Sequence, residues 1–342
     1  MIRNRTFMIS VIAIGVVASA FVFHGQGVKG ADAVGQDHAA APGIYFPPGA
    51  IWTQDARNAP LDPQSAKMIA WLADAGGWGT GQMHVDFAIR VLQANATTPY
   101  VPFRKGKEFY EDSDPVSTFP LPAGGGMENQ AGYQCPIEQE DCHIIVVDRG
   151  HGKLYEAFQA NVASGVLTAG FVAVWDLDRV YPVTGRGDQC TSADAAGFPI
   201  APLLFSADEL ANGSINHAIR FILPNPRIRA HVYVRPATHA GGPDGPPAAP
   251  PYGAHFRLKA SYDVSQLKPA AQIVARAMQR YGMYLADGGN MALTAQNDAD
   301  TKAKYSDLDF GPRDLQSLKV TDFEVLDSGP AIPLTYDCVR NR

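Results

Sequence analysis

Histidine, arginine and tyrosine side chains recur at alternate positions in three segments, opposite apolar residues. The segments are 83–92, 230–235 and 255–262, and alternation with a period of two is typical of half-buried β-strands. If these strands lie side by side, their polar faces form one cationic, hydrogen-bonding surface that suits a carboxylate-bearing polysaccharide. Ordinary solvated strand faces explain the same pattern. The residues that we predict to bind substrate, with Arg220 from a fourth segment, are His84, Asp86, Arg90, Arg220, Tyr233, Arg235, His255 and Arg257.

Carboxylates inside apolar strands form a second pattern. Glu156 shares a predicted strand face with Leu154, and Asp176 shares one with Val174. A carboxylate on a buried face has a raised pKa or a cationic partner. Two such groups across a cleft supply the acid and the nucleophile or base of a glycosidase. The alternative is a structural ion pair or a loop anchor.

Small residues dominate the segment 190–200, which reads Cys-Thr-Ser-Ala-Asp-Ala-Ala-Gly-Phe-Pro-Ile. Ser192 and Asp194 lie in this predicted rigid loop, and rigid polar loops often line sites. Ser192 lacks the flanking glycines of a nucleophile elbow, so a hydrolase triad is disfavoured. His239 follows a predicted strand at a position suited to a site. The predicted catalytic residues are His217, His239, Glu156, Asp176 and Asp194.

These residues suit a lyase or a glycoside hydrolase that acts on a polysaccharide. In a lyase, Arg235 and Arg257 would hold carboxylates while a histidine or Tyr233 moves the proton. In a hydrolase, the catalysts would be the three predicted carboxylates. The alternative is a non-catalytic glycan-binding or cell-envelope protein. We expect no cofactor and no metal, because the spacing of the histidines and acids near residue 148 matches no established metal site.

The elements that must position these residues are mostly strands. Further strands are predicted at 144–147, 154–162, 171–177 and 217–223, whereas helices are few. Proline at position 63 starts one helix, a capping box at 206–209 starts a second, and the third runs over 267–281. The fold class is therefore all-β or β-rich, an antiparallel β-sandwich or jelly-roll-like domain with a few peripheral helices.

The amino-terminal segment indicates export. Arg3 and Arg5 precede an apolar stretch, and small residues before Ala20 and Ala33 offer two cleavage sites. We predict a signal peptide and short leader over residues 1–33, a disordered lead-in over 34–43, and a single β-rich domain over 44–342. The destination is the periplasm or the exterior. Export favours disulfides, and the most natural pairing of the four cysteines is Cys135 with Cys142 and Cys190 with Cys338.

Composition excludes one class of partner. The formal net charge is -6, whereas nucleic-acid binding requires an excess of basic residues. No segment after the signal peptide is long and apolar enough to span a membrane. We expect a monomer whose partner is a polysaccharide or another glycan.

Four long motifs resemble a family of exported microbial proteins to which no activity is assigned. They are the segments 190–200, His217-Ala-Ile-Arg-Phe-Ile-Leu-Pro-Asn225, Tyr233-Val-Arg-Pro-Ala-Thr-His239 and Tyr281-Gly-Met-Tyr-Leu-Ala-Asp287. The resemblance covers most of the mature chain and implies secretion and a shared single-domain fold. It carries over no catalytic residue.

Overall fold

The computed structural model describes residues 41–136 and 141–341. The predicted signal peptide and nearly all of the predicted lead-in lie outside the described residues. Three α-helices are present in the described part, α1 (Ser65–Asp74), α2 (Ala207–Ala211) and α3 (Pro269–Arg280). The capping box of α2 is confirmed, because Ser206 accepts a hydrogen bond from the Glu209 amide and Glu209 accepts from the Ser206 amide. None of these helices is long and apolar enough to cross a lipid bilayer.

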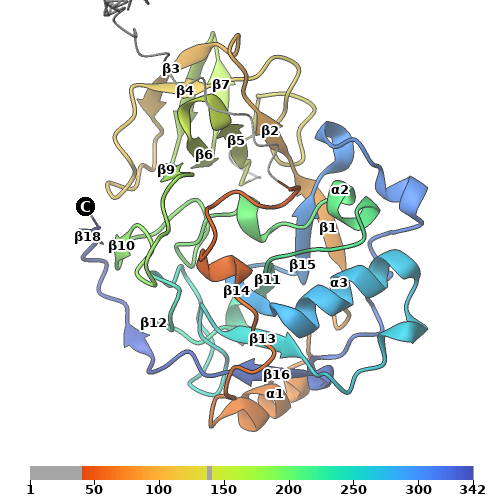
Figure 1. Ribbon diagram of the computed structural model, residues 1–342. Helices are drawn as coiled ribbons and strands as arrows, with labels where there is room; N and C mark the ends of the chain where they lie inside the picture. The colour runs from red at the N-terminus through yellow and green to blue at the C-terminus, as the bar shows by residue number, and fades with distance from the viewer. Residues whose placement is uncertain (1–40, 137–140, 342) are drawn as a thin grey trace, which may run out of the picture. The chain divides into compact units, whose positions relative to one another are not determined.

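The largest sheet has six strands in the order β1-β15-β11-β14-β13-β16 (Figure 1). Its strands are β1 (Val85–Ile89), β15 (Leu293–Gln296), β11 (Ile219–Leu223), β14 (Met283–Gly288), β13 (His255–Leu258) and β16 (Phe323–Leu326). Strands β11 and β14 are parallel, as are β1 and β15, whereas β13 is antiparallel to both of its neighbours. Every residue of β11 is buried, which is typical of a strand covered on both faces.

Two four-stranded sheets pack around a smaller core of their own. The first has the order β2-β5-β6-β9, with β2 (Val91–Gln93), β5 (Ile144–Asp148), β6 (Lys153–Phe158) and β9 (Phe171–Asp176). The second has the order β4-β3-β8-β7, with β4 (Thr118–Pro120), β3 (Tyr100–Lys105), β8 (Val166–Ala169) and β7 (Asn161–Ala163). Alternate residues of β5 belong to the smaller and the larger core, so the first sheet separates the two cores.

Two short strand pairs complete the described strands. They are β10 (Gly187–Asp188) with β18 (Val339–Arg340), and β12 (Val232–Tyr233) with β17 (Ile332–Pro333). The strand-rich class with few helices is confirmed. The pairing is mixed rather than wholly antiparallel, and the sandwich or jelly-roll arrangement is not confirmed.

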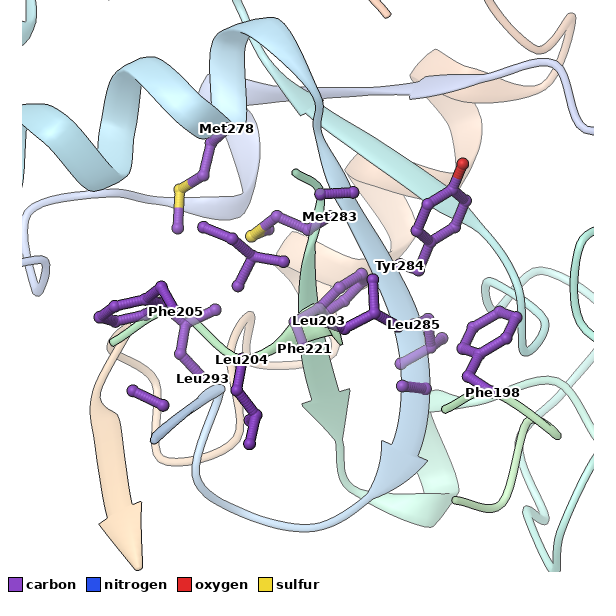
Figure 2. Packing of buried hydrophobic residues seen from close by; sticks show 14 of the residues in the cluster. Phe198, Leu203, Leu204, Phe205, Phe221, Met278, Met283, Tyr284, Leu285 and Leu293 are labelled. Atoms are coloured by element: carbon purple, nitrogen blue, oxygen red, sulfur yellow. The ribbon is translucent and has the colours of Figure 1, made fainter. Parts of the chain in front are cut away.

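The larger core lies against the six-stranded sheet. Figure 2 shows Phe221, Leu285 and Leu293 from three adjacent strands packed beside Leu203 and Phe205 from the connection that precedes α2. Helix α3 adds Met278 from its buried face. Burial of large side chains such as these stabilises the fold by about 1.5–3 kcal/mol each. The packing fixes the ends of β11 and β14, from which the site described below is built.

Both predicted disulfides are present, Cys135–Cys142 and Cys190–Cys338. The second links residues 148 positions apart in the sequence. It joins the start of the 190–200 loop to the segment that leads into β18 near the carboxyl end of the chain. The loop is therefore tied at its first residue to a distant part of the fold.

Candidate functional site

The three strands expected to form one polar surface do not lie side by side. Strands β1 and β13 belong to the same sheet, but β15, β11 and β14 separate them. Strand β12 belongs to a different sheet, where it pairs with β17. The expectation of a continuous polysaccharide platform built from these strands is therefore not met. Sequence periodicity identifies strands but not their order in a sheet. The neighbours of each strand therefore could not be predicted from the sequence.

The cations expected to hold a substrate are already paired with carboxylates. The ion pairs are Arg90 with Asp300 at 2.7 Å, Arg235 with Asp188 at 2.9 Å and Arg257 with Glu324 at 2.6 Å. Arg257 also donates to main-chain oxygens of the segment before α1. These contacts tie distant segments together. They give the three arginines a structural role in the absence of a ligand.

The aromatic members of the expected platform also differ from the prediction. Tyr233 was expected on the outer face, but its side chain is fully buried and its hydroxyl donates to Asp188 at 2.6 Å. His255 stacks on Tyr284 with ring centroids 4.1 Å apart. Burial lowers the pKa of His255 to about 4, so the ring is neutral. The ring nitrogens of His84 lie near the side chains of Thr80 and Gln82.

Two of the predicted catalysts are anchors of the fold. Glu156 is fully buried and accepts hydrogen bonds from the amides of Ile200 and Ala201 and from the indole of Trp175. Both ring nitrogens of His217 face acceptors, the Ala218 carbonyl at 2.8 Å and the capping residue Glu209 at 3.0 Å. The loop-anchor alternative therefore accounts for the contacts of both residues.

Asp176 is an exposed partner of Lys153 at 2.9 Å. The side chain retains 42% of its accessible surface. The hydrogen bond from the Lys153 ammonium holds the pKa of this carboxyl below its usual range. Such a permanently ionised surface group is poorly suited to donating a proton.

The remaining predicted residues, Asp194 and Arg220, meet in the interior. Asp194 Oδ1 lies 2.9 Å from Arg220 Nη2, and both side chains are almost completely buried. Arg220 also donates to Thr294 of β15 at 2.7 Å. The same Nη2 lies 3.5 Å from Oδ2 of Asp287, a residue that the sequence did not single out as a catalyst. The guanidinium of Arg220 is thus close to two carboxyl groups, those of Asp194 and Asp287.

A register shift in the sheet sets the direction of Asp287. Arg220 pairs with Tyr284, but Ile222 pairs with Asp287 and skips Ala286. Because paired residues of parallel strands face the same side, and one extra residue reverses the alternation, Asp287 lies on the face of Arg220. The carbonyl of Ala286 instead accepts a hydrogen bond from the amide of Ala196 in the 190–200 loop. The irregularity therefore positions a carboxyl group and ties the loop to the strand.

A second buried ion pair lies on the opposite side of the loop. His143 Nδ1 is 2.6 Å from Glu128, and His143 Nε2 is 2.9 Å from the carbonyl of Ala193. Since both neighbours are acceptors, both ring nitrogens donate and the ring is a cation. Burial acts to lower the pKa of His143, but attraction to Glu128 outweighs burial and raises it to about 9.

Asp287 and the 190–200 loop line a cavity of about 260 Å³, which we name the loop pocket. Its wall includes Thr191, Ser192, Ala193 and Ala195 from the loop, the ring of His239, and the carboxyl-bearing residues Asp141 and Asp287, and is completed by Tyr110, Phe158, Phe171, Gly241 and Gly242. The volume is just below the roughly 300–1,000 Å³ of pockets for drug-sized ligands. The pocket therefore suits a small ligand or one unit of a larger one.

Two carboxyl groups with raised pKa values line the loop pocket. Burial raises the pKa of Asp287 to about 7, and the negative charge of Asp194 adds to this effect. Burial also raises the pKa of Asp141, with Asp287 contributing repulsion. Four interacting carboxyl groups, Glu128, Asp141, Asp194 and Asp287, thus share the two cations Arg220 and His143. Burial, reinforced by the negative charge of Asp194, therefore raises the pKa of Asp287 to about 7.

His239 presents a neutral ring to the same pocket. Its Nδ1 lies 3.1 Å from the carbonyl of Ala195, so Nδ1 donates and Nε2 keeps its lone pair. Burial lowers the pKa of His239 below the usual value for histidine. Of the predicted catalytic residues, His239 is the one that lines the loop pocket, and it is fitted to accept a hydrogen bond from a hydroxyl group.

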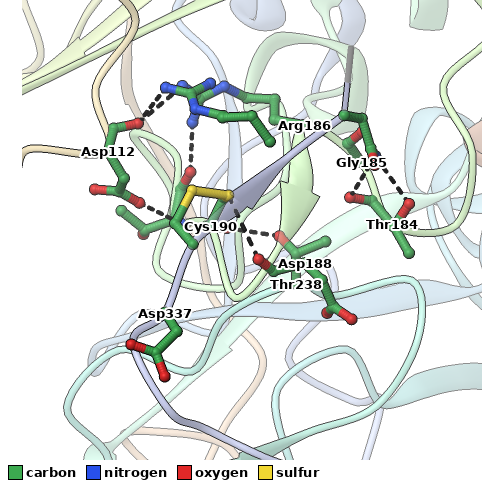
Figure 3. The surroundings of a disulfide bond; sticks show 12 residues. Asp112, Thr184, Gly185, Arg186, Asp188, Cys190, Thr238 and Asp337 are labelled. Atoms are coloured by element: carbon green, nitrogen blue, oxygen red, sulfur yellow. Dashed lines mark hydrogen bonds between the residues drawn. A yellow bond between two sulfur atoms is a disulfide. The ribbon is translucent and has the colours of Figure 1, made fainter.

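Hydrogen bonds and the disulfide Cys190–Cys338 connect the 190–200 loop to its surroundings. Figure 3 shows Cys190, Arg186 and Thr238 around the disulfide, with Arg186 donating to the Thr191 carbonyl and Thr238 donating to the Cys190 carbonyl at 2.7 Å. Ser192 Oγ is occupied by main-chain oxygens at 2.5 Å and 2.9 Å. Its role is to shape the loop, in agreement with the missing nucleophile elbow.

Sequence reasoning overlooked Asp141, Glu128 and Asp287. Asp287 ends an apolar strand immediately before two glycines, which was a usable signal because site residues often follow buried strands. Asp141 and Glu128 lie in irregular segments without a periodic pattern. The described residues include no group of three or more histidine, cysteine, aspartate or glutamate side chains that is arranged to hold a metal ion.

Comparison with protein-family models found no match. Comparisons with curated proteins and with solved structures found none either. The resemblance to exported microbial proteins therefore stays a prediction, and function must be argued from the loop pocket itself.

Proposed function

We propose that the protein is an exported glycoside hydrolase that works in the loop pocket, with Asp287 as the general acid. The observation that carries this proposal is the placement of Asp287 at the pocket wall with a pKa of about 7. A carboxyl group that holds its proton near neutral pH is the donor that a leaving sugar oxygen requires. Asp141 on the same wall is the second carboxyl group of such a mechanism.

The reaction balances with these two residues. The bond between the anomeric carbon and the leaving oxygen breaks, and the leaving oxygen takes the proton of Asp287. A water molecule forms the new bond to the anomeric carbon while ionised Asp141 takes one of its protons. Exchange with solvent then returns the proton to Asp287. General acid and base catalysis of this kind contributes about 10²–10⁴-fold to the rate.

The lining favours a neutral sugar over an acidic one. The described residues that line the loop pocket include aromatic rings, hydroxyl groups, carboxyl groups and a neutral histidine, but neither arginine nor lysine. A polyuronate lyase needs a cation beside the substrate carboxylate. Apolar ring faces and hydrogen-bonding carboxyl groups instead suit the hydroxylated ring of a neutral sugar. This composition supports a hydrolase rather than a lyase, and the volume supports cleavage of one terminal unit.

The test uses a panel of aryl and alkyl glycosides of neutral and acidic sugars. The wild type should cleave a neutral glycoside, and its activity should fall as the pH rises through about 7, where Asp287 loses its proton. D287N should lose about 10²–10⁴-fold on an alkyl glycoside. It should lose much less on a dinitrophenyl glycoside, because dinitrophenolate leaves without a proton.

D176N is the matched control, since it changes an exposed aspartate that is paired with a lysine and should leave the rate unchanged. Retained glycan binding without turnover across the panel would favour the non-catalytic binding alternative. A D287N variant as active as the wild type on the alkyl glycoside would exclude Asp287 as the acid.

A further inference from the structure

Arg220 lies between two carboxyl groups in unequal contact. Its Nη2 is 2.9 Å from Asp194 and 3.5 Å from Asp287, and Nη1 is anchored by Thr294 at 2.7 Å. The closer contact is therefore with the carboxylate that does not line the loop pocket. The side chain has 4% of its surface exposed, so water contributes little to solvating its charge.

The pair is also incompletely bonded. Among the described residues, the buried side-chain atoms without a hydrogen-bond partner are Asp194 Oδ2 and Arg220 Nε. An arginine and a carboxylate usually form two parallel hydrogen bonds. The contact between Arg220 and Asp194 is thus a single hydrogen bond through Nη2, the same nitrogen that lies 3.5 Å from Asp287.

We propose that Arg220 is a positioning residue for proton transfer at Asp287. Its guanidinium stabilises the carboxylates of both Asp194 and Asp287. The inference rests on the proposed function. While Asp287 holds its proton, the guanidinium pairs with Asp194. When Asp287 gives its proton to the leaving oxygen, Nη2 closes the 3.5 Å gap to the new carboxylate. Asp194 therefore acts as a holding partner for Arg220 between turnovers.

Several groups face Asp287 and contribute to its titration. The groups that interact with Asp287 are Arg220 of β11, Asp194 of the 190–200 loop, Asp141 and His143 from the segment before β5, and Tyr252. His239 lines the same pocket. Arg220 and His143 favour the ionised form of Asp287, whereas Asp194 and Asp141 oppose it. Changing the charge of Asp194 or Arg220 should therefore move the titration of Asp287 in opposite directions.

The experiment measures the titration of Asp287 directly and also the alkaline limb of the activity profile. Aspartate labelled with ¹³C at Cγ gives a carboxyl signal that D287N identifies. In D194N, the charge of Arg220 becomes available to Asp287, and the titration should move down by about one pH unit. In the double variant R220M/D194N, which buries no unpaired carboxylate at 194, it should move up by about one unit relative to D194N.

Thr294→Val is the matched control, because it removes a neutral hydrogen bond to the same guanidinium and no charge. It should leave the titration in place. Equal titration of Asp287 in the wild type, D194N and R220M/D194N would overturn the charge sharing. Titrations that move as expected in a protein that cleaves no glycoside would refute the proposed function and leave the charge sharing supported.

Discussion

Replacing Glu156 with glutamine should change how stability depends on pH. Glu156 Oε1 accepts from the amides of Ile200 and Ala201, and Oε2 accepts from the indole of Trp175. Burial raises the pKa of Glu156 from 4.5 to about 7, because the cost of burying the charge outweighs the three donors. The folded protein therefore binds a proton more tightly at this position than the unfolded chain does.

The direction and the magnitude of the pH dependence follow from the difference between the folded and unfolded pKa of Glu156. Between the unfolded and the folded pKa, the folded state binds more protons, so the free energy of unfolding falls as the pH rises. A shift of 2.5 units, from 4.5 to about 7, corresponds to a loss of about 3 kcal/mol at 1.36 kcal/mol per unit. The loss is complete above about pH 8. E156Q has no proton to release at this position, so its free energy of unfolding does not show this loss.

The amide has a separate cost that does not depend on pH. Its carbonyl replaces Oε1, but its NH₂ group faces the Trp175 N–H, and one unsatisfied buried donor costs about 1–3 kcal/mol. E156Q should therefore be less stable than the wild type near pH 4. It should equal or exceed the wild type near pH 8.

Urea unfolding monitored by circular dichroism, from about pH 4 to about pH 8, measures the difference. D176N is the control, because the pKa of that exposed carboxyl is lowered by Lys153. For D176N the difference should be small and should grow with pH. A stability difference between the wild type and E156Q that stays constant, or that grows with pH, would show that the three donors outweigh burial.

Two further predictions concern parts that hold the loop pocket in place. Serine substitution of Cys190 and Cys338, which are 148 residues apart, should lower the free energy of unfolding by about 5 kcal/mol in the chain-entropy model, against about 2 kcal/mol for Cys135 and Cys142, which are 7 apart. Denaturant midpoints compare the two, and equal losses would contradict the loop-length argument. Ser206→Ala removes the acceptor that caps α2 and should cost about 1 kcal/mol. A thermal midpoint equal to that of the wild type would show that the cap is dispensable.

Local patterns in the sequence predicted the elements well. Of the apolar stripe Met68, Ile69, Trp71 and Leu72, all but the partly buried Trp71 are buried in α1, and the predicted third helix is α3. The capping box and both disulfides are present as predicted. These features depend on contacts within a few residues or on a small number of possible pairings, so the sequence contains the required information.

The candidate site was harder to predict because it depends on the order of strands. Arg220 and Asp287 come from β11 and β14, which are far apart in the sequence, and the pairing of these two strands places the guanidinium beside the carboxyl group. The direction of Asp287 depends on a one-residue register shift that periodicity cannot reveal. Tyr233 shows the same limit, since alternation assigned it to the outer face of a strand that spans two residues in the structure.

The buried position of Arg220 is consistent with the proposed role of its charge beside Asp287. The residue lies inside a strand whose five residues are all buried, among isoleucine, phenylalanine and leucine. Moving a guanidinium and a carboxylate out of water costs several kcal/mol per ion, and well-packed apolar residues at such positions are often equally stable or more stable. An apolar side chain at 220 would also satisfy the alternation of the strand. An apolar residue at 220 could replace none of the polar contacts with Asp194, Thr294 and Asp287, and of these three residues Asp287 lines the loop pocket.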